Sequence, residues 1–129
     1  MTNGGSFMRV RAFLFAVLTA VATLAVAAVP TGAAPSAAGP GEVCFWTRPG
    51  QMGEGWCYRP GGYAEVPRNL HDNAYSFRSD FNGSVWAVDW TRHGCVFREI
   101  RAYELDDNWD WGNKIDGVDS SRPVDCQPG

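Results

Sequence analysis

A histidine beside a carboxylate is the pattern in this chain that most resembles catalytic chemistry, and it occurs at His71-Asp72. A neighbouring carboxylate raises the basicity of an imidazole and can make it a general base. Adjacent residues on a strand point to opposite faces, however, so these two side chains would cooperate only within a turn. The other histidine is His93, and the chain has no G-x-S-x-G, no H-E-x-x-H and no phosphate-binding glycine loop. We therefore predict that the protein is not an enzyme.

Cysteine is the second residue type with chemistry to offer. The chain has four, Cys44, Cys57, Cys95 and Cys126. No C-x-x-C pair or Cys/His cluster is present, so the spacing argues against a zinc site. Four cysteines allow three disulfide pairings. We prefer Cys44–Cys57 with Cys95–Cys126, because the first pair would close a local hairpin, and small exported domains typically need such cross-links.

Carboxylates and tryptophans gather between Glu104 and Trp111. Crowded carboxylates favour a hard cation such as calcium, which binds through oxygen. Trp109 and Trp111 alternate with Asp110, which would put both rings on one face of a strand. Rings on an open face can stack on sugars, so a carbohydrate- or cell-wall-binding domain is one interpretation. We favour the other, in which the rings fill a thin core, because large rings bury the most area.

The N-terminal segment indicates export. Two arginines precede an apolar run over residues 12–29, and a segment of small residues follows, which together describe a secretory signal peptide. A membrane anchor is the alternative, because the run is about as long as the shortest spanning helices. The predicted boundaries are a signal peptide over 1–34, a flexible linker over 35–41 and one domain over 42–129. We expect the mature protein to be secreted, extracellular and monomeric.

Charge excludes one class of partner. The predicted domain keeps nine basic and all fourteen acidic residues, a formal charge of −5. A negative domain repels phosphate backbones, so we expect no nucleic-acid partner, and no membrane partner after signal cleavage. Lys114 is the only lysine beside ten arginines. This bias suggests a GC-rich, bacterial genome.

The mature chain consists of two copies of one strand-rich pattern. An aromatic run, a glycine turn and a second aromatic run occupy Val43–Tyr58 and recur over Ser84–Arg98. Gly53 and Gly94 align at an offset of 41, and the same offset superimposes a later polar corner and a closing strand. No segment has a helical period. We therefore predict an all-β Greek-key sandwich from two related motifs, about 43–80 and 84–121, stapled by disulfides.

These residues resemble the βγ-crystallin motif, in which an aromatic strand and a glycine turn precede a corner rich in Asp or Asn. The chain looks like the secreted bacterial domains of peptidase inhibitor family I36. The resemblance rests on CFW…MGEGWCY (44–58), DNAYSF (72–77) and WGNKIDGV (111–118), and it covers nearly all of the mature region. It implies a βγ-crystallin-like fold and inhibition of an extracellular peptidase, with a metallopeptidase as the implied target.

The resemblance also implies a calcium site. In βγ-crystallin-like domains the signature is two Asn or Asp residues, two variable positions, then Ser or Thr and Ser. The segment 72–77 departs from it only at Phe77, while 116–121 supplies serines but lacks the second Asn or Asp. The ligands implied are Asp72, Asn73, Ser76, Asp116 and Ser120. In the alternative, these side chains close turns on their own backbone and the protein has no cofactor.

An inhibitor needs a rigid, exposed loop, because rigidity lowers the entropy cost of binding. Both glycine turns lie beside cysteines and meet this description. The candidate inhibitory residues are Arg48, Gly50, Met52 and Gly53 in the first turn, and Arg92, His93 and Gly94 in the second. The favoured function is inhibition of an extracellular peptidase. The alternatives are a non-inhibitory calcium-binding or structural module and a carbohydrate-binding domain.

Overall fold

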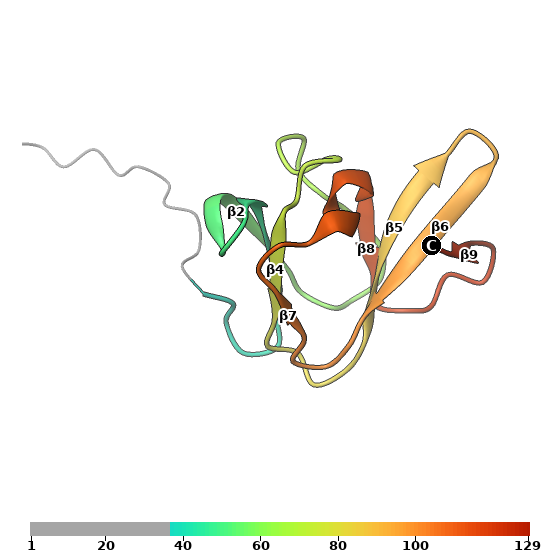
Figure 1. The fold of residues 1–129 in the computed structure, drawn as a ribbon. Coiled ribbons are helices and arrows are strands. Elements are labelled where there is room, and N and C mark those ends of the chain that lie inside the picture. The colour runs from blue at the N-terminus through green and yellow to red at the C-terminus, as the bar shows by residue number, and fades with distance from the viewer. Residues whose placement is uncertain (1–36) are drawn as a thin grey trace, which may run out of the picture.

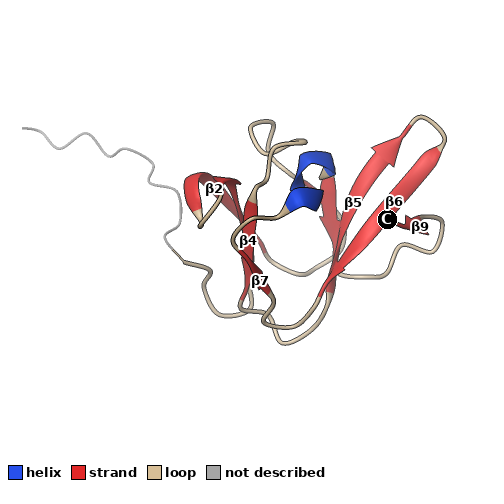
Figure 2. Cartoon of the chain, in the orientation of Figure 1, coloured by secondary structure: helices blue, strands red, loops and turns tan. Residues whose placement is uncertain are grey.

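A computed structural model describes residues 37–129, and it consists of short β-strands in two sheets (Figure 1). One 3₁₀ turn is the only helical element of this region, as Figure 2 shows by colour. The all-β prediction is therefore confirmed. The predicted signal peptide, 1–34, lies outside the described residues. Within 37–129, no helix has the length and apolar character that crossing a membrane requires.

The first sheet has four antiparallel strands in the order β2-β1-β4-β7. Its strands are β1 (Val43–Arg48), β2 (Met52–Tyr58), β4 (Ser76–Ser79) and β7 (Leu105–Asp106). The two aromatic runs form the β1–β2 hairpin, in which Cys44 pairs with Cys57 and Phe45 with Trp56. The central strand, β1, has four consecutive buried residues, because both of its faces are covered.

The second sheet has five strands in the order β3-β8-β5-β6-β9. Its strands are β3 (Ala64–Glu65), β5 (Val85–Thr91), β6 (Gly94–Ile100), β8 (Gly117–Asp119) and β9 (Gln127–Pro128). β9 runs parallel to β6, and the other pairs are antiparallel. The 3₁₀ turn η1 (Asp110–Lys114) precedes β8, where the sequence predicted only a polar corner.

The later strands of the two copies keep the predicted offset, whereas the first two strands of each copy start 42 residues apart. The starts of β3 and β7, and those of β4 and β8, are 41 residues apart. The short third strand of each copy crosses to the sheet of the other copy, because β3 pairs with β8 and β7 pairs with β4. Each sheet therefore contains strands from both copies, and the fold is a Greek-key sandwich.

Aromatic rings fill the space between the sheets. Phe45, Phe77 and Trp109 contact one another with ring centroids 4.8 to 6.2 Å apart, and none is more than 2% exposed. Trp111 is partly buried and stacks on Trp109 at 5.7 Å. The carbohydrate-binding interpretation of this tryptophan pair is therefore wrong, because a ring as buried as Trp109 cannot stack on a sugar. Burial of large rings in a thin core dominates at this position.

Both preferred disulfides are present, Cys44–Cys57 with a sequence separation of 13 and Cys95–Cys126 with a separation of 31. No cysteine of the described residues is free, so no thiolate is left for a metal. The second disulfide ties the C-terminal tail to β6 and packs with Val88 and Phe97 in a small cluster on the outer face of the second sheet. Two disulfides indicate folding in an oxidising compartment.

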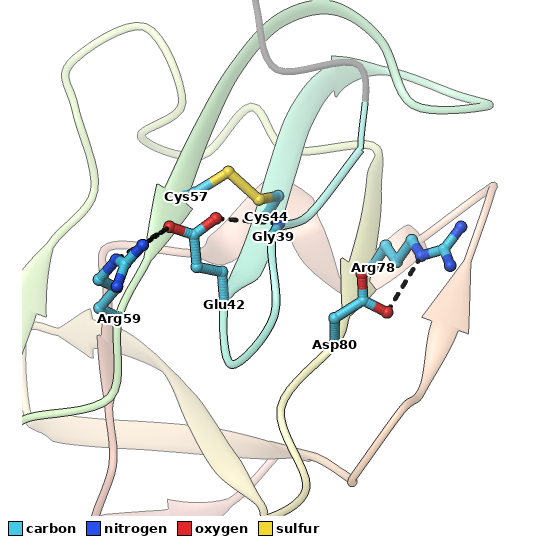
Figure 3. The surroundings of a disulfide bond; sticks show 7 residues. All are labelled: Gly39, Glu42, Cys44, Cys57, Arg59, Arg78 and Asp80. Atoms are coloured by element: carbon cyan, nitrogen blue, oxygen red, sulfur yellow. Dashed lines mark hydrogen bonds and ion pairs between the residues drawn. A yellow bond between two sulfur atoms is a disulfide. The ribbon is translucent and has the colours of Figure 1, made fainter.

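The packed domain begins before Glu42. Ala38 is only 8% exposed and packs against the Cys44–Cys57 disulfide. The Glu42 carboxylate, drawn in Figure 3, accepts a hydrogen bond of 3.0 Å from the Gly39 amide. The C-terminal end of the predicted linker, 35–41, therefore contacts the folded domain.

Candidate functional site

The β5–β6 hairpin projects beyond the other strands of the second sheet (Figure 1). Its ladder has seven residue pairs, but the neighbouring strands accompany only part of it. β8 pairs only with residues 86–88 of β5, and β9 pairs only with Val96 and Phe97 of β6. The outer part of the hairpin, residues 89–95, is hereafter called the ribbon. It is a two-stranded element with no further strand on either side.

The tip of the ribbon presents Arg92, His93 and Gly94, all exposed. Gly94 has a φ of 147°, a value that favours glycine. The Thr91 hydroxyl donates a hydrogen bond of 3.2 Å to the Gly94 carbonyl and closes the turn. Cys95 is buried and disulfide-bonded, which fixes the base of the turn. The three residues predicted for the second inhibitory loop therefore lie together on a constrained turn.

An exposed aromatic pair joins the ribbon to the residue that precedes β3. Tyr63 and Trp90 are 42% and 53% exposed, their ring centroids are 6.1 Å apart, and Trp90 Nε1 donates a 2.8 Å hydrogen bond to Tyr63 Oη. Burial of part of the Tyr63 phenol raises its pKa. A Cβ on Gly117 would lie 2.3 Å from Tyr63 Oη, so this glycine makes room for the ring.

Sequence reasoning missed the Tyr63–Trp90 pair. Alternation along a strand does not say which of its faces stays uncovered. The one available signal was Gly117 itself, which the offset of 41 aligns with Ser76 of the first copy.

The first hairpin turn is held against the body of the domain. The Gly50 amide donates to the Asp107 carbonyl at 2.8 Å, and the Gln51 amide donates to Ser76 Oγ at 2.9 Å. Ser76 Oγ in turn donates to the Arg48 carbonyl at 2.7 Å. The predicted residues of this loop are all exposed: Arg48, Gly50, Met52 and Gly53. Their loop is anchored at several backbone atoms, whereas the second tip is not.

Four titratable side chains meet near the base of the ribbon, and we call them the acidic corner: His71, Asp72, Asp89 and Asp116. His71 Nδ1 lies 2.9 Å from Asp116 Oδ1 and 3.8 Å from Asp72 Oδ2. Asp72 has a φ of 55° in a turn, which is the geometry that its cooperation with His71 requires. The closer partner of His71 is nevertheless Asp116, which comes from the other copy.

Electrostatics at the acidic corner are unfavourable to a further negative charge. The Asp116 side chain is 8% exposed, and its Oδ2 accepts a 2.6 Å hydrogen bond from the Trp90 amide. Burial, and then the charges of Asp116 and Asp72, raise the pKa of Asp89 above its ordinary value, while Lys114 opposes the shift. A cation near these carboxylates would relieve this repulsion.

The structure separates the residues that were expected to bind calcium. Asp72 and Asp116 lie together in the acidic corner with His71. Asn73 Nδ2 instead donates to the Asn69 carbonyl, and Ser76 Oγ donates to the Arg48 carbonyl of the first hairpin. Ser120 Oγ accepts a hydrogen bond from the Gly62 amide. Asn73, Ser76 and Ser120 therefore fit the alternative in which polar side chains close turns.

The side chains of the acidic corner do not match the ligands that calcium prefers. Calcium takes six to eight oxygen ligands, and the acidic corner places an imidazole nitrogen between its carboxylates. One nitrogen with two or three carboxylate oxygens better suits a borderline cation such as zinc.

The acidic run over residues 104–110 does not form a separate cation site. Glu104 forms an ion pair with Arg98 at 2.6 Å, and Asp107 accepts from the Gln51 side chain at 3.3 Å. Asp106 accepts a hydrogen bond from the Asn108 amide. These carboxylates therefore serve different local contacts.

Comparison with known proteins gives a likeness in structure only. No known protein family matches the chain, and no curated protein matches its sequence. A structure solved in work on the evolution of the eye lens βγ-crystallin domain fold matches with a TM-score of 0.52 and 15% identity, over 68% of this chain and 89% of that one.

Two structures of the abundant perithecial protein from Neurospora crassa also match, each with a TM-score of 0.49. The first is 21% identical and covers 66% of this chain, which spans 40% of the fungal chain. The second, a βγ-crystallin domain in the Ca²⁺-bound form, is 19% identical over 67% of this chain and 92% of that domain. The likeness to the eye lens βγ-crystallin domain structure, together with the two disulfides, shows a disulfide-stapled domain of βγ-crystallin fold.

Proposed function

We propose that this domain is a secreted inhibitor of an extracellular peptidase and that it binds its target through the β5–β6 hairpin. The observation that carries the proposal is the ribbon, whose tip side chains, Arg92 and His93, have no hydrogen-bond or ion-pair partner among the described residues. The first hairpin has the same strand pattern but is anchored to Ser76 and Asp107.

Rigidity is what an inhibitory loop requires. A loop that is already ordered loses less conformational entropy on binding, and it stays in place when a peptidase engages it. The continuous ladder of the ribbon, Gly94 at the turn and the Cys95–Cys126 disulfide all restrict the tip.

The residue types around the ribbon suit a protein partner. Trp, Tyr and Arg are the residues most enriched among those that dominate binding energy at protein interfaces. Trp90 and Arg92 belong to the ribbon, and Tyr63 is hydrogen-bonded to Trp90. Binding without turnover by a monomer is the mode of action that we propose. The resemblance to the inhibitor family implies a metallopeptidase as the target.

The oxidised protein should abolish the activity of a susceptible peptidase at a stoichiometric ratio. We would assay it against a thermolysin-type and a subtilisin-type peptidase. Because tip residues would lie in the interface, Arg92→Ala combined with His93→Ala should raise the inhibition constant by about tenfold or more. Arg48→Ala combined with Met52→Ala in the first loop is the matched control and should leave the constant nearly unchanged.

Lack of inhibition across both peptidase classes would contradict the proposed function. Inhibition that is lost in the first-loop variant and kept in the ribbon variant would contradict the assignment of the binding element alone.

Binding of a divalent cation at the acidic corner is a second candidate function. It is favoured by the convergence of Asp72 and Asp116, which belong to different copies, on the His71 imidazole. The donor set points to zinc before calcium.

Zinc should raise the melting temperature if this second function holds. Cation at ten times its dissociation constant would stabilise the fold by about 1.4 kcal/mol. The exposed Asp72→Asn variant should lose the response, and Asp125→Asn, an exposed carboxylate elsewhere, should keep it. A response that is equal in both variants, or absent from the wild type at millimolar zinc, would exclude the site.

A further inference from the structure

A cleft opens at the side of the second sheet, away from the ribbon tip. It has a volume of about 560 Å³, within the range of small-ligand sites. β5 contributes Trp86, β6 contributes residues 97–99, and the following loop contributes Arg101 and Glu104. The C-terminal tail closes the cleft with Arg122, Pro128 and Gly129.

Three arginines and two glutamates, Glu99 and Glu104, line this cleft, so its side chains carry a small positive excess although the domain is acidic. Three of its nine basic residues, Arg98, Arg101 and Arg122, line the cleft. The charge of Arg98 is already balanced, because Arg98 forms an ion pair with Glu104 at 2.6 Å. Among the described residues, the guanidinium groups of Arg101 and Arg122 have no carboxylate partner. Two exposed cations therefore face one cleft without counter-charges of their own.

Arg122 is held by an aromatic ring. Its guanidinium carbon lies 5.4 Å from the centroid of Phe97, which is itself buried. An arginine stacked in this way keeps the edge of its planar group free, and that edge matches the two oxygens of a carboxylate. The cleft thus has one pre-oriented donor edge and, in Arg101, a second donor.

Glu99 restricts the kind of anion that would bind. Its Oε1 accepts a 2.6 Å hydrogen bond from Ser84, and the exposed carboxylate lies in the same cleft as the arginines. This negative charge opposes a compact, doubly charged anion such as sulfate more strongly than a singly charged carboxylate. It also offers acceptor oxygens to hydroxyl donors. Trp86, partly buried, adds an apolar wall of the kind that a sugar ring packs against.

We propose that this cleft binds acidic saccharides of the uronic-acid type. The sugar carboxylate would pair with Arg122 and Arg101, its hydroxyls would donate to Glu99, and its ring would pack on Trp86. This site is separate from the ribbon and does not depend on peptidase inhibition.

Calorimetric titration of the folded protein tests the proposal with three probes: trigalacturonate, neutral maltotriose and sodium sulfate. Trigalacturonate should bind with a dissociation constant at or below about 1 mM, and the two other probes at least about tenfold more weakly. Arg122→Gln and Arg101→Gln should each weaken trigalacturonate binding about tenfold, since each removes a charge-assisted hydrogen bond. Arg68→Gln, an exposed arginine outside the cleft, is the matched control and should bind normally.

No binding of trigalacturonate up to about 10 mM, or equal binding of maltotriose or sulfate, would overturn the proposal. Equal weakening by Arg68→Gln would do the same, because it would reveal non-specific attraction. Should a cleft variant fail to fold, the indole N–H resonance of Trp86 in the wild-type protein gives the answer. It should shift on addition of trigalacturonate, and an unchanged resonance would overturn the assignment.

Discussion

Ser76 and Asp116 perform related tasks in the two copies. Ser76 joins the first hairpin to its closing strand by accepting from the Gln51 amide. The equivalent position of the second copy is Gly117, which carries no hydroxyl. There the Asp116 carboxylate, one residue earlier, accepts from the Trp90 amide. Asp116 therefore joins the second hairpin to its closing strand, as Ser76 does in the first copy. Its negative charge contributes to the acidic corner.

Asp89→Asn should stabilise the protein at neutral pH. The folded-state pKa of Asp89 is raised, chiefly by burial, so the folded protein holds this proton more tightly than the unfolded chain does. The stabilisation that this pKa difference provides is fully present below the ordinary aspartate pKa of 3.8. It is lost as the pH rises through the raised pKa of the folded state. Removing the carboxylate should therefore raise the melting temperature by a few degrees at pH 7 and have little effect below pH 4.

Melting curves from pH 3 to pH 8 in a chelating buffer measure this difference. Asp125→Asn, at an exposed position, serves as the control. A stabilisation that stays constant over this pH range would show that the ionised carboxylate is not its origin.

Sequence reasoning found part of the acidic corner. Asp72, Asp116 and His71 were all singled out, because they are the polar residues of the two corners. Asp72 and Asp116 were assigned to separate half-sites, because a sequence does not show that the two corners face each other. Asp89 was missed, since an acidic residue near the end of a strand gives no signal of its own.

At the scale of elements, the two hairpins have diverged in what surrounds them. The first is hydrogen-bonded to Asp107, the residue that follows β7, whereas the ribbon is restrained mainly by its disulfide and by Asp116. Elements with few neighbours rely more on local cross-links. The Cys95–Cys126 disulfide should therefore matter more for function than Cys44–Cys57.

Replacing Cys95 and Cys126 by serine should lower stability by about 3 kcal/mol and also weaken peptidase inhibition. Beyond this disulfide, the tail is held to β6 by the two residues of β9, the hydrogen bond from the Gly129 amide to the Phe97 carbonyl and the stacking of Arg122 on Phe97. With so few contacts left, the tail should become more susceptible to proteolysis. The same change at Cys44 and Cys57 should cost a similar free energy but leave inhibition nearly intact. Denaturant unfolding and inhibition assays of both variants check this prediction. Equal loss of inhibition in the two variants would contradict it.

At the scale of the whole molecule, the fold was predictable because several signals agreed. Glycine turns flanked by aromatic runs identified the hairpins, and the offset of 41 identified the duplication. The crossing of β3 and β7 between sheets was not predictable, because two-residue strands carry almost no pattern. Which hairpin projects also depends on contacts between the copies, such as that of Gly50 with Asp107.

The crossing of β3 and β7 also bears on the origin of the chain. A polypeptide of half this length would have a third strand with nothing to pair with and a layer of rings open to water. Only a second identical chain, which provides the reciprocal strand, would complete the fold of such a polypeptide. A half-length ancestor would therefore have been a homodimer, and fusion of two gene copies would have removed the need for two chains to associate.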